Sequence, residues 1–118
     1  MKGPLLVVEI GEVFTAEELQ RLIDDLEQLE RQLPVTPSRI IDMRRITRVT
    51  VDFQTLHSLA ERRRQAQPKN PFRTAGVATS PVAIGYARMF QTLMENHPFV
   101  TVQLFDVFED AERWALGG

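Results

Sequence analysis

A β-strand that leads into a capped helix can be read from Leu5-Leu-Val-Val-Glu-Ile-Gly-Glu-Val-Phe-Thr-Ala-Glu-Glu-Leu19. The first six residues are mostly aliphatic and Gly11 ends the run, a pattern that predicts a strand. Thr15 and Glu18 then have the spacing of a capping box, in which each side chain accepts a hydrogen bond from the backbone N–H of the other residue. The sequence therefore predicts a helix that begins next to Thr15.

Strands and helices continue to alternate along the chain. Leucines and one isoleucine repeat at three- and four-residue steps up to Leu33, which predicts an amphipathic helix that Pro34 ends. Three more apolar segments predict strands at residues 39–43, 72–79 and 99–105. Three more helices are predicted to begin at capping residues, namely Asp52 or Thr50, Ser80 and Asp106.

Strands that alternate with helices form mainly parallel sheets joined by right-handed crossovers. The predicted fold is therefore a single α/β domain over residues 1–118. Its elements follow the order β-α-β-α-β-α-β-α, with a mainly parallel four-stranded sheet flanked by helices.

The composition is that of an ordinary globular protein. Of the 118 residues, 43% are hydrophobic and 25% are charged, which is enough apolar material for a core. Cysteine is absent, so disulfides, thiolate metal sites and thiol catalysis are excluded. The apolar run from Leu5 to Val8 is too short for a membrane span or a signal peptide. We expect a cytoplasmic protein without a membrane span.

No group of residues in the sequence points to catalysis. His57 and Ser58 are adjacent in the predicted second helix, where neighbours point about 100° apart and cannot form a Ser-His pair. His57 and Glu61 share a helix face, but a metal site needs at least one more ligand. Gly76 and Gly85 lie outside any phosphate-binding motif. The sequence predicts no catalytic residue, no metal site and no cofactor.

Charge is distributed unevenly along the chain. The net charge is −2, yet residues 39–73 carry nine basic and three acidic side chains, a net charge of +6. This segment can bind an acidic partner. The net negative charge of the whole chain and the scarcity of aromatic side chains near the basic residues argue against binding of nucleic acid. The carboxylates of the first helix lie mostly opposite its leucine stripe, and we interpret them as a solvated face: Asp24, Asp25, Glu27 and Glu30.

From Leu5 onward the chain resembles the STAS domains, typified by anti-sigma-factor antagonists, and the broader SpoIIAA-like group, which is related to a family of lipid carriers. Besides the first strand and helix start, four segments carry the resemblance: Ile40-Ile-Asp-Met43, Val51-Asp-Phe-Gln-Thr-Leu56, Thr79-Ser-Pro81 and Val107-Phe-Glu-Asp-Ala-Glu-Arg-Trp114. The resemblance implies a SpoIIAA-like fold and a non-enzymatic role as a regulatory or protein-interaction module.

The segment that the antagonists phosphorylate is altered in this chain. In those proteins an aspartate at the start of the second helix precedes two serines and then Gly-Leu, and one serine accepts a phosphoryl group. Asp52 and Leu56 match this pattern, but Phe53 and Gln54 replace the serines and Thr55 replaces the glycine. We therefore expect the usual phosphorylation switch to be absent. The sequence does not decide whether Thr50 or Thr55 is phosphorylated instead.

Two sets of residues are candidates for binding. The resemblance, together with the cluster of arginines there, assigns an unidentified protein partner to the loop after the second strand and the start of the second helix: Arg44, Arg45, Arg48, Asp52, Phe53 and Gln54. A second copy of the chain is a further candidate partner, to which the sequence assigns no residues. The alternative is a carrier or sensor of a small apolar, lipid-like ligand, because the predicted third helix carries large, adaptable side chains. These are Tyr86, Met89, Phe90, Leu93 and Met94, which core packing would also explain.

Overall fold

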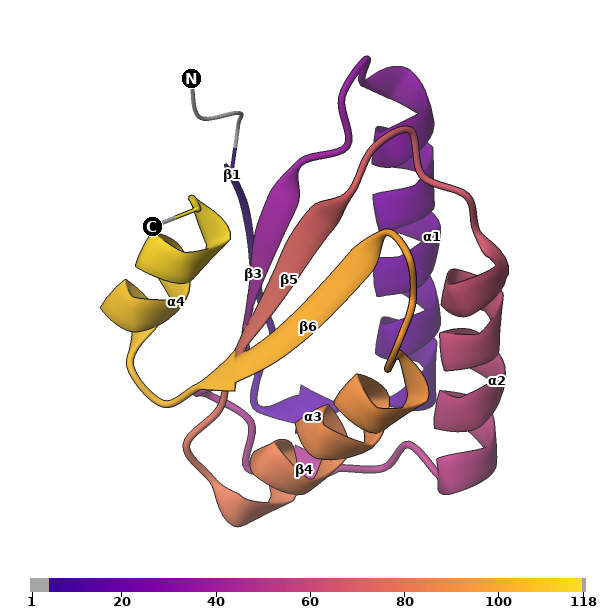
Figure 1. Ribbon diagram of the computed structural model, residues 1–118. Coiled ribbons are helices and arrows are strands. Elements are labelled where there is room, and N and C mark those ends of the chain that lie inside the picture. Colours follow the sequence, from indigo (N-terminus) through magenta and orange to yellow (C-terminus); the bar gives the residue numbers. More distant parts are fainter. Residues whose placement is uncertain (1–4, 118) are drawn as a thin grey trace.

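The computed structural model describes residues 5–117 and shows an α/β fold built on a four-stranded parallel sheet (Figure 1). The predicted fold class is confirmed, and residues 1–4 and 118 of the predicted domain lie outside the described residues. The strands are, in spatial order, β1 (Leu5–Glu9), β3 (Ser38–Asp42), β5 (Phe72–Val77) and β6 (Val100–Phe105). A separate parallel pair, β2 (Val13–Phe14) and β4 (Arg48–Val49), was not predicted from the sequence.

Three helices connect the strands of the sheet, and a fourth follows the last strand: α1 (Ala16–Gln32), α2 (Phe53–Gln65), α3 (Pro81–Leu93) and α4 (Phe108–Ala115). In the described part of the chain no helix is long and apolar enough to cross a membrane. The crossovers β1–β3, β3–β5 and β5–β6 all step across the sheet in the same direction. Because such crossovers are right-handed, their helices lie on one face. Figure 1 shows α1, α2 and α3 on this face and α4 alone on the other.

Side-chain caps determine where three of the helices begin. Thr15, Asp52 and Ser80 each accept a hydrogen bond from the backbone N–H three residues later, which pairs a donor that the first turn leaves free. These three caps confirm the sequence predictions. The predicted cap at Asp106 is wrong, because α4 begins one residue later than expected, with Val107 at the capping position and no side-chain hydrogen bond there.

Small side chains allow α4 to pack closely on its face of the sheet. Ala111 and Ala115 of the helix form one buried cluster with Ile40 of β3 and with Ala75 and Val77 of β5. Four of these five side chains have no exposed surface at all, and Ala115 retains only 6%. The contact therefore has no spare room for a larger side chain.

Replacing Ala111 by Leu is expected to lower the free energy of unfolding by about 1–3 kcal/mol, because the added carbon atoms have to displace β5 or α4. Urea denaturation measures this change. Glu112→Leu serves as the control, since the same side chain at this neighbouring, exposed position stays in water. Equal stability of the wild-type protein and Ala111→Leu would contradict close packing at α4.

Candidate functional site

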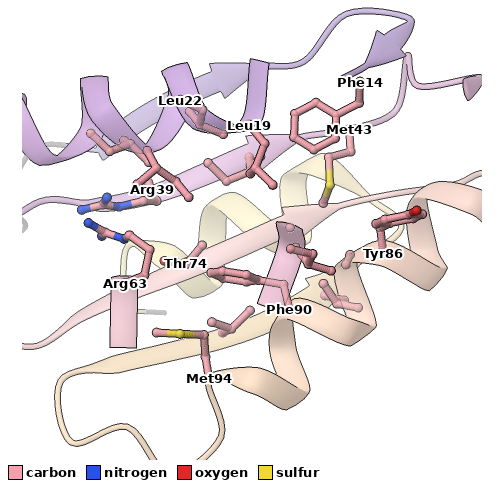
Figure 2. A pocket seen from close by; sticks show the side chains of 18 of the residues that line it. Phe14, Leu19, Leu22, Arg39, Met43, Arg63, Thr74, Tyr86, Phe90 and Met94 are labelled. Atoms are coloured by element: carbon pink, nitrogen blue, oxygen red, sulfur yellow. The ribbon is translucent and has the colours of Figure 1, made fainter. Parts of the chain in front are cut away.

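An apolar cavity of about 120 Å³ lies between the sheet and the three crossover helices. It exists because α2 packs mainly against α1 and α3, so that α2 covers the space above the sheet without filling it. Side chains from the sheet and all three helices line this space (Figure 2). Among them are Leu19, Ile23, Met43, Leu56, Phe90 and Leu104.

The central strand contributes small side chains to the cavity. Thr74 and Gly76 alternate on the side of β5 that faces the helices, and both line the cavity. A methyl group added at Gly76 would come within 3.0 Å of the side-chain ends of Leu104 and Met43. These two flexible side chains therefore lie over the glycine, and their conformations determine how deep the cavity is at this point.

Three of the five residues predicted to bind an apolar ligand line the cavity, namely Tyr86, Phe90 and Met94. The phenol of Tyr86 donates a hydrogen bond to the backbone carbonyl of Val51, so only its ring is presented to the cavity. The other two, Met89 and Leu93, do not line it and pack against the core between α1 and α2. Core packing, the alternative interpretation of this stripe, applies to all five residues, since Tyr86 and Phe90 pack against the same cluster and Met94 is buried beside Phe72 and Val100.

Two buried arginines lie at one end of the cavity. Arg39 of β3 is 1% exposed and Arg63 of α2 is 8% exposed, and both side chains line the cavity. Figure 2 shows the two guanidinium groups beside each other, with Phe14, Met43 and Tyr86 at the opposite end. Buried charges are costly unless they are paired. Neither arginine was predicted from the sequence to belong to a site.

Glu30 of α1 lies between the two guanidinium groups. Its Oε2 atom is 2.6 Å from Arg39 Nη1 and 2.9 Å from Arg63 Nη2, and its Oε1 atom accepts a hydrogen bond from Arg63 Nη1 at 3.1 Å. Burial raises the pKa of Glu30, but the hydrogen bonds and charges of Arg63 and then Arg39 outweigh this effect and hold the pKa below its usual range. Glu30 is therefore ionised at neutral pH, and we call these three residues the Arg39–Glu30–Arg63 cluster.

The Arg39–Glu30–Arg63 cluster is incompletely paired. Arg39 Nη2 donates a hydrogen bond to the carbonyl of Pro37 at 2.8 Å, but Arg39 Nε is buried without any hydrogen-bond partner. The two guanidinium groups and one carboxylate carry a net charge of +1. The next carboxylate, that of Glu27, is 3.6 Å from Arg63 and forms closer contacts with Arg62 at the surface. The cluster thus contains one buried donor without a partner, Arg39 Nε, and its charge is balanced once Glu27, Arg62 and Asp24 are counted with it.

The interpretation of the first helix's carboxylates as a solvated face is wrong for Glu27 and Glu30. Both are half-buried and contact the C-terminal end of α2, where Arg62 also pairs with Asp24. The acidic residues of α1 and the basic end of α2 therefore neutralise each other across the helix contact. The opposite charges of the two successive helices were the available signal in the sequence.

The C-terminal end of α2 is also attached to the loop between α3 and β6. Arg64 Nη1 donates a hydrogen bond to the carbonyl of Glu95 at 2.8 Å, and His97 Nε2 lies 2.9 Å from the carbonyl of Arg64. His97 Nδ1 accepts hydrogen bonds from the backbone N–H groups of Phe99 and Val100. With Nδ1 accepting, Nε2 is the ring nitrogen that donates to the carbonyl of Arg64, so the imidazole joins both chain segments.

The six residues predicted to bind a protein partner are divided between two faces of the sheet. Arg44 forms two hydrogen bonds with the carboxylate of Asp42, at 2.7 and 2.9 Å, and its guanidinium lies 5.2 Å from the ring of Phe108 in α4. Asp52, Phe53 and Gln54 lie at the start of α2, on the other face (Figure 1). The exposed Arg45 and Arg48 lie in the segment between these groups.

Comparisons of the chain with protein-family models, with curated proteins and with solved structures found no match. The resemblance to STAS and SpoIIAA-like domains therefore stays a prediction. The cavity and the Arg39–Glu30–Arg63 cluster are the features from which a function can be inferred.

Replacing Glu30 by Gln is expected to lower the free energy of unfolding by about 3–5 kcal/mol at neutral pH, because two buried arginines lose their shared counter-charge. The pKa of Glu30 is lower in the folded protein than its ordinary value of 4.5. Its stabilising contribution is therefore complete above about pH 4.5 and is lost as the pH falls through the folded-state pKa. Denaturation at a series of pH values should show the difference between wild type and variant narrowing in acid.

The exposed Asp25 on the same helix provides the control, since Asp25→Asn removes a carboxylate charge that faces water. This variant should change stability by less than about 0.5 kcal/mol. The stabilising role of the ionised Glu30 would be contradicted if the free energy of unfolding of the wild-type protein exceeded that of Glu30→Gln by the same amount down to the lowest pH.

Proposed function

We propose that this protein binds a small apolar molecule in the cavity between the sheet and α1, α2 and α3, and acts as its carrier or sensor. The supporting observation is the apolar cavity itself, because protein interiors contain few voids larger than a water molecule. Its volume is about 120 Å³, and an apolar cavity of about 150 Å³ in another protein admits benzene. A single ring or a short aliphatic chain therefore suits this site.

The position of α2 favours a sensor. Leu56 and Arg63 of this helix line the cavity, and Phe53 at its start is exposed to solvent. A ligand in the cavity would therefore contact the same helix that the family resemblance assigns to partner binding. Coupling between two sites requires an element whose arrangement both sites influence, and α2 is placed to be that element.

Filling the cavity is expected to abolish ligand binding and leave the fold intact. Ala87 of α3 is buried and lines the cavity, so the larger side chain of Ala87→Leu would occupy it. Benzene can serve as the probe, with methionine methyl groups labelled for NMR. Met43 and Met94 line the cavity whereas Met89 does not. Benzene should shift the Met43 and Met94 signals of the wild-type protein more than that of Met89, and should shift none in Ala87→Leu.

Gly85→Ala is the matched control on the same helix. A Cβ atom at Gly85 meets nothing within 4 Å, and alanine is favoured over glycine in a helix by about 1 kcal/mol. This variant should therefore be slightly more stable than the wild-type protein and should bind benzene normally. Shifts that persist in Ala87→Leu would place the ligand outside the cavity, and a wild-type protein that binds no apolar probe would contradict the proposal.

A second candidate function is protein binding at the start of α2, in accord with the family resemblance. The observation that favours it is the 58% exposure of Phe53. A large aromatic side chain contributes little to the fold at such an exposed position, and aromatic residues are enriched at the centres of protein interfaces.

Phe53→Ser is expected to weaken the capture of a protein partner by at least tenfold if the ring is a central contact, since such residues contribute about 2 kcal/mol or more. Affinity capture from cell extract compares this variant with the wild-type protein and with Val82→Ser. Val82 is an exposed aliphatic residue on α3 and controls for loss of any surface apolar group. Equal recovery of the partner with all three proteins would contradict the proposal that the partner binds at Phe53.

A further inference from the structure

We propose that the ligand of the cavity is a small uncharged alcohol or phenol, whose hydroxyl group forms a hydrogen bond with the hydroxyl of Thr74. This inference rests on the proposed function and adds to it the chemical class of the ligand. Three features of the cavity limit which molecules fit, namely its apolar lining, the balanced charges at its end and one hydroxyl group on its floor.

Thr74 keeps accessible surface although it lies at the centre of the fold. Its strand, β5, is an inner strand of the sheet, and the neighbours of Thr74 in register are Arg39 of β3 and Val102 of β6. On the opposite face of β5, Ala75 and Val77 have no exposed surface. Thr74 by contrast is only half-buried, and it lines the cavity (Figure 2). The surface that Thr74 keeps therefore borders the cavity.

The hydroxyl of Thr74 takes part in no hydrogen bond within residues 5–117. Two other side-chain atoms without partners, Thr36 Oγ1 and Arg39 Nε, are completely enclosed, whereas Thr74 Oγ1 is not. Hydroxyl groups both donate and accept, and polar groups inside proteins nearly always have a partner. A ligand hydroxyl in the cavity would give Thr74 the partner that no group of the described chain supplies.

The charges beside the cavity favour an uncharged ligand. Three basic and three acidic side chains form one network of ion pairs there: Arg39, Arg62, Arg63, Asp24, Glu27 and Glu30. Because the network is balanced, it offers no counter-charge to a charged ligand, and burial of an unpaired charge is costly. A hydroxyl group carries no charge and needs only one hydrogen-bond partner, which Thr74 provides.

The rest of the cavity favours an apolar body for the ligand. A volume of about 120 Å³ admits one ring or a short aliphatic chain. Two of the residues that line the cavity carry a hydroxyl group, Thr74 and Tyr86. Tyr86 directs its hydroxyl to the backbone carbonyl of Val51 and presents only its ring. Thr74 is therefore the residue whose hydroxyl is free to pair with the ligand.

Phenol and toluene test this inference, because they have nearly the same shape and differ in one hydroxyl group. Titrations followed by the Met43 and Met94 methyl signals compare the wild-type protein with Thr74→Val, in which a methyl group replaces the hydroxyl. Phenol should bind Thr74→Val about three- to tenfold more weakly, the loss expected for one hydrogen bond. Toluene should bind both proteins with similar affinity.

A loss of affinity that is equal for phenol and toluene, or absent for both, would overturn the hydroxyl inference and leave the apolar site standing. If benzene, toluene and phenol all fail to bind the wild-type protein, the proposed function itself is overturned. Benzoate should bind the wild-type protein more weakly than phenol, because its charge would be buried without a partner. Tighter binding of benzoate would overturn the inference that the ligand is uncharged.

Thr101→Val is the matched control, since it makes the same change at an exposed position of β6 that does not line the cavity. Phenol should bind this variant as tightly as it binds the wild-type protein. Urea denaturation of Thr74→Val gives a second measurement that needs no ligand. Its midpoint should equal or exceed that of the wild-type protein, because the new methyl group lies among apolar side chains. A lower midpoint would show that the hydroxyl is bonded within the protein and would overturn the inference.

Discussion

The carboxylate of Glu30 joins three elements of the fold, because it pairs with Arg39 of β3 and Arg63 of α2 while belonging to α1. This buried contact holds the C-terminal end of α2 at a distance from the sheet that is set by two long arginine side chains. The side chains of Arg64 and His97 hold the same end of the helix through their contacts with the backbone carbonyls of Glu95 and Arg64. The cavity follows from this arrangement, since apolar side chains of ordinary length from α2 do not fill the space that the arginines span.

The two faces of the sheet differ in how they are covered. On one face, alanines bring α4 against the central strands and leave no space. On the other face, α2 packs mainly on its neighbouring helices, and Thr74 and Gly76 below it are small. The same strand, β5, therefore contributes a tightly packed surface through one set of alternating residues and the cavity surface through the other.

Local patterns predicted the sheet and all four helices, because apolar periodicity and capping residues act over a few positions. The β2–β4 pair was not predicted, because two residues per strand are too few to form a recognisable pattern. The sequence predicted Tyr86, Phe90 and Met94 as ligand-binding residues together with Met89 and Leu93. Only the packed structure shows that the first three, which are spaced four residues apart, line the cavity and that the other two do not. Arg39 alternates with Ile41 and Met43, so its inward orientation was accessible from the strand pattern, whereas its pairing with Glu30 and Arg63 depends on how the helices pack.

The crossovers of this fold also set the order in which it can be completed during protein synthesis. All three connecting helices lie on one face (Figure 1), so the opposite face is covered by α4, which follows the last strand. Until residues 108–115 have left the ribosome, Ile40, Ala75 and Val77 have no helix to shield them from water. The emerging chain therefore exposes this apolar surface of β3 and β5 until α4 docks on it.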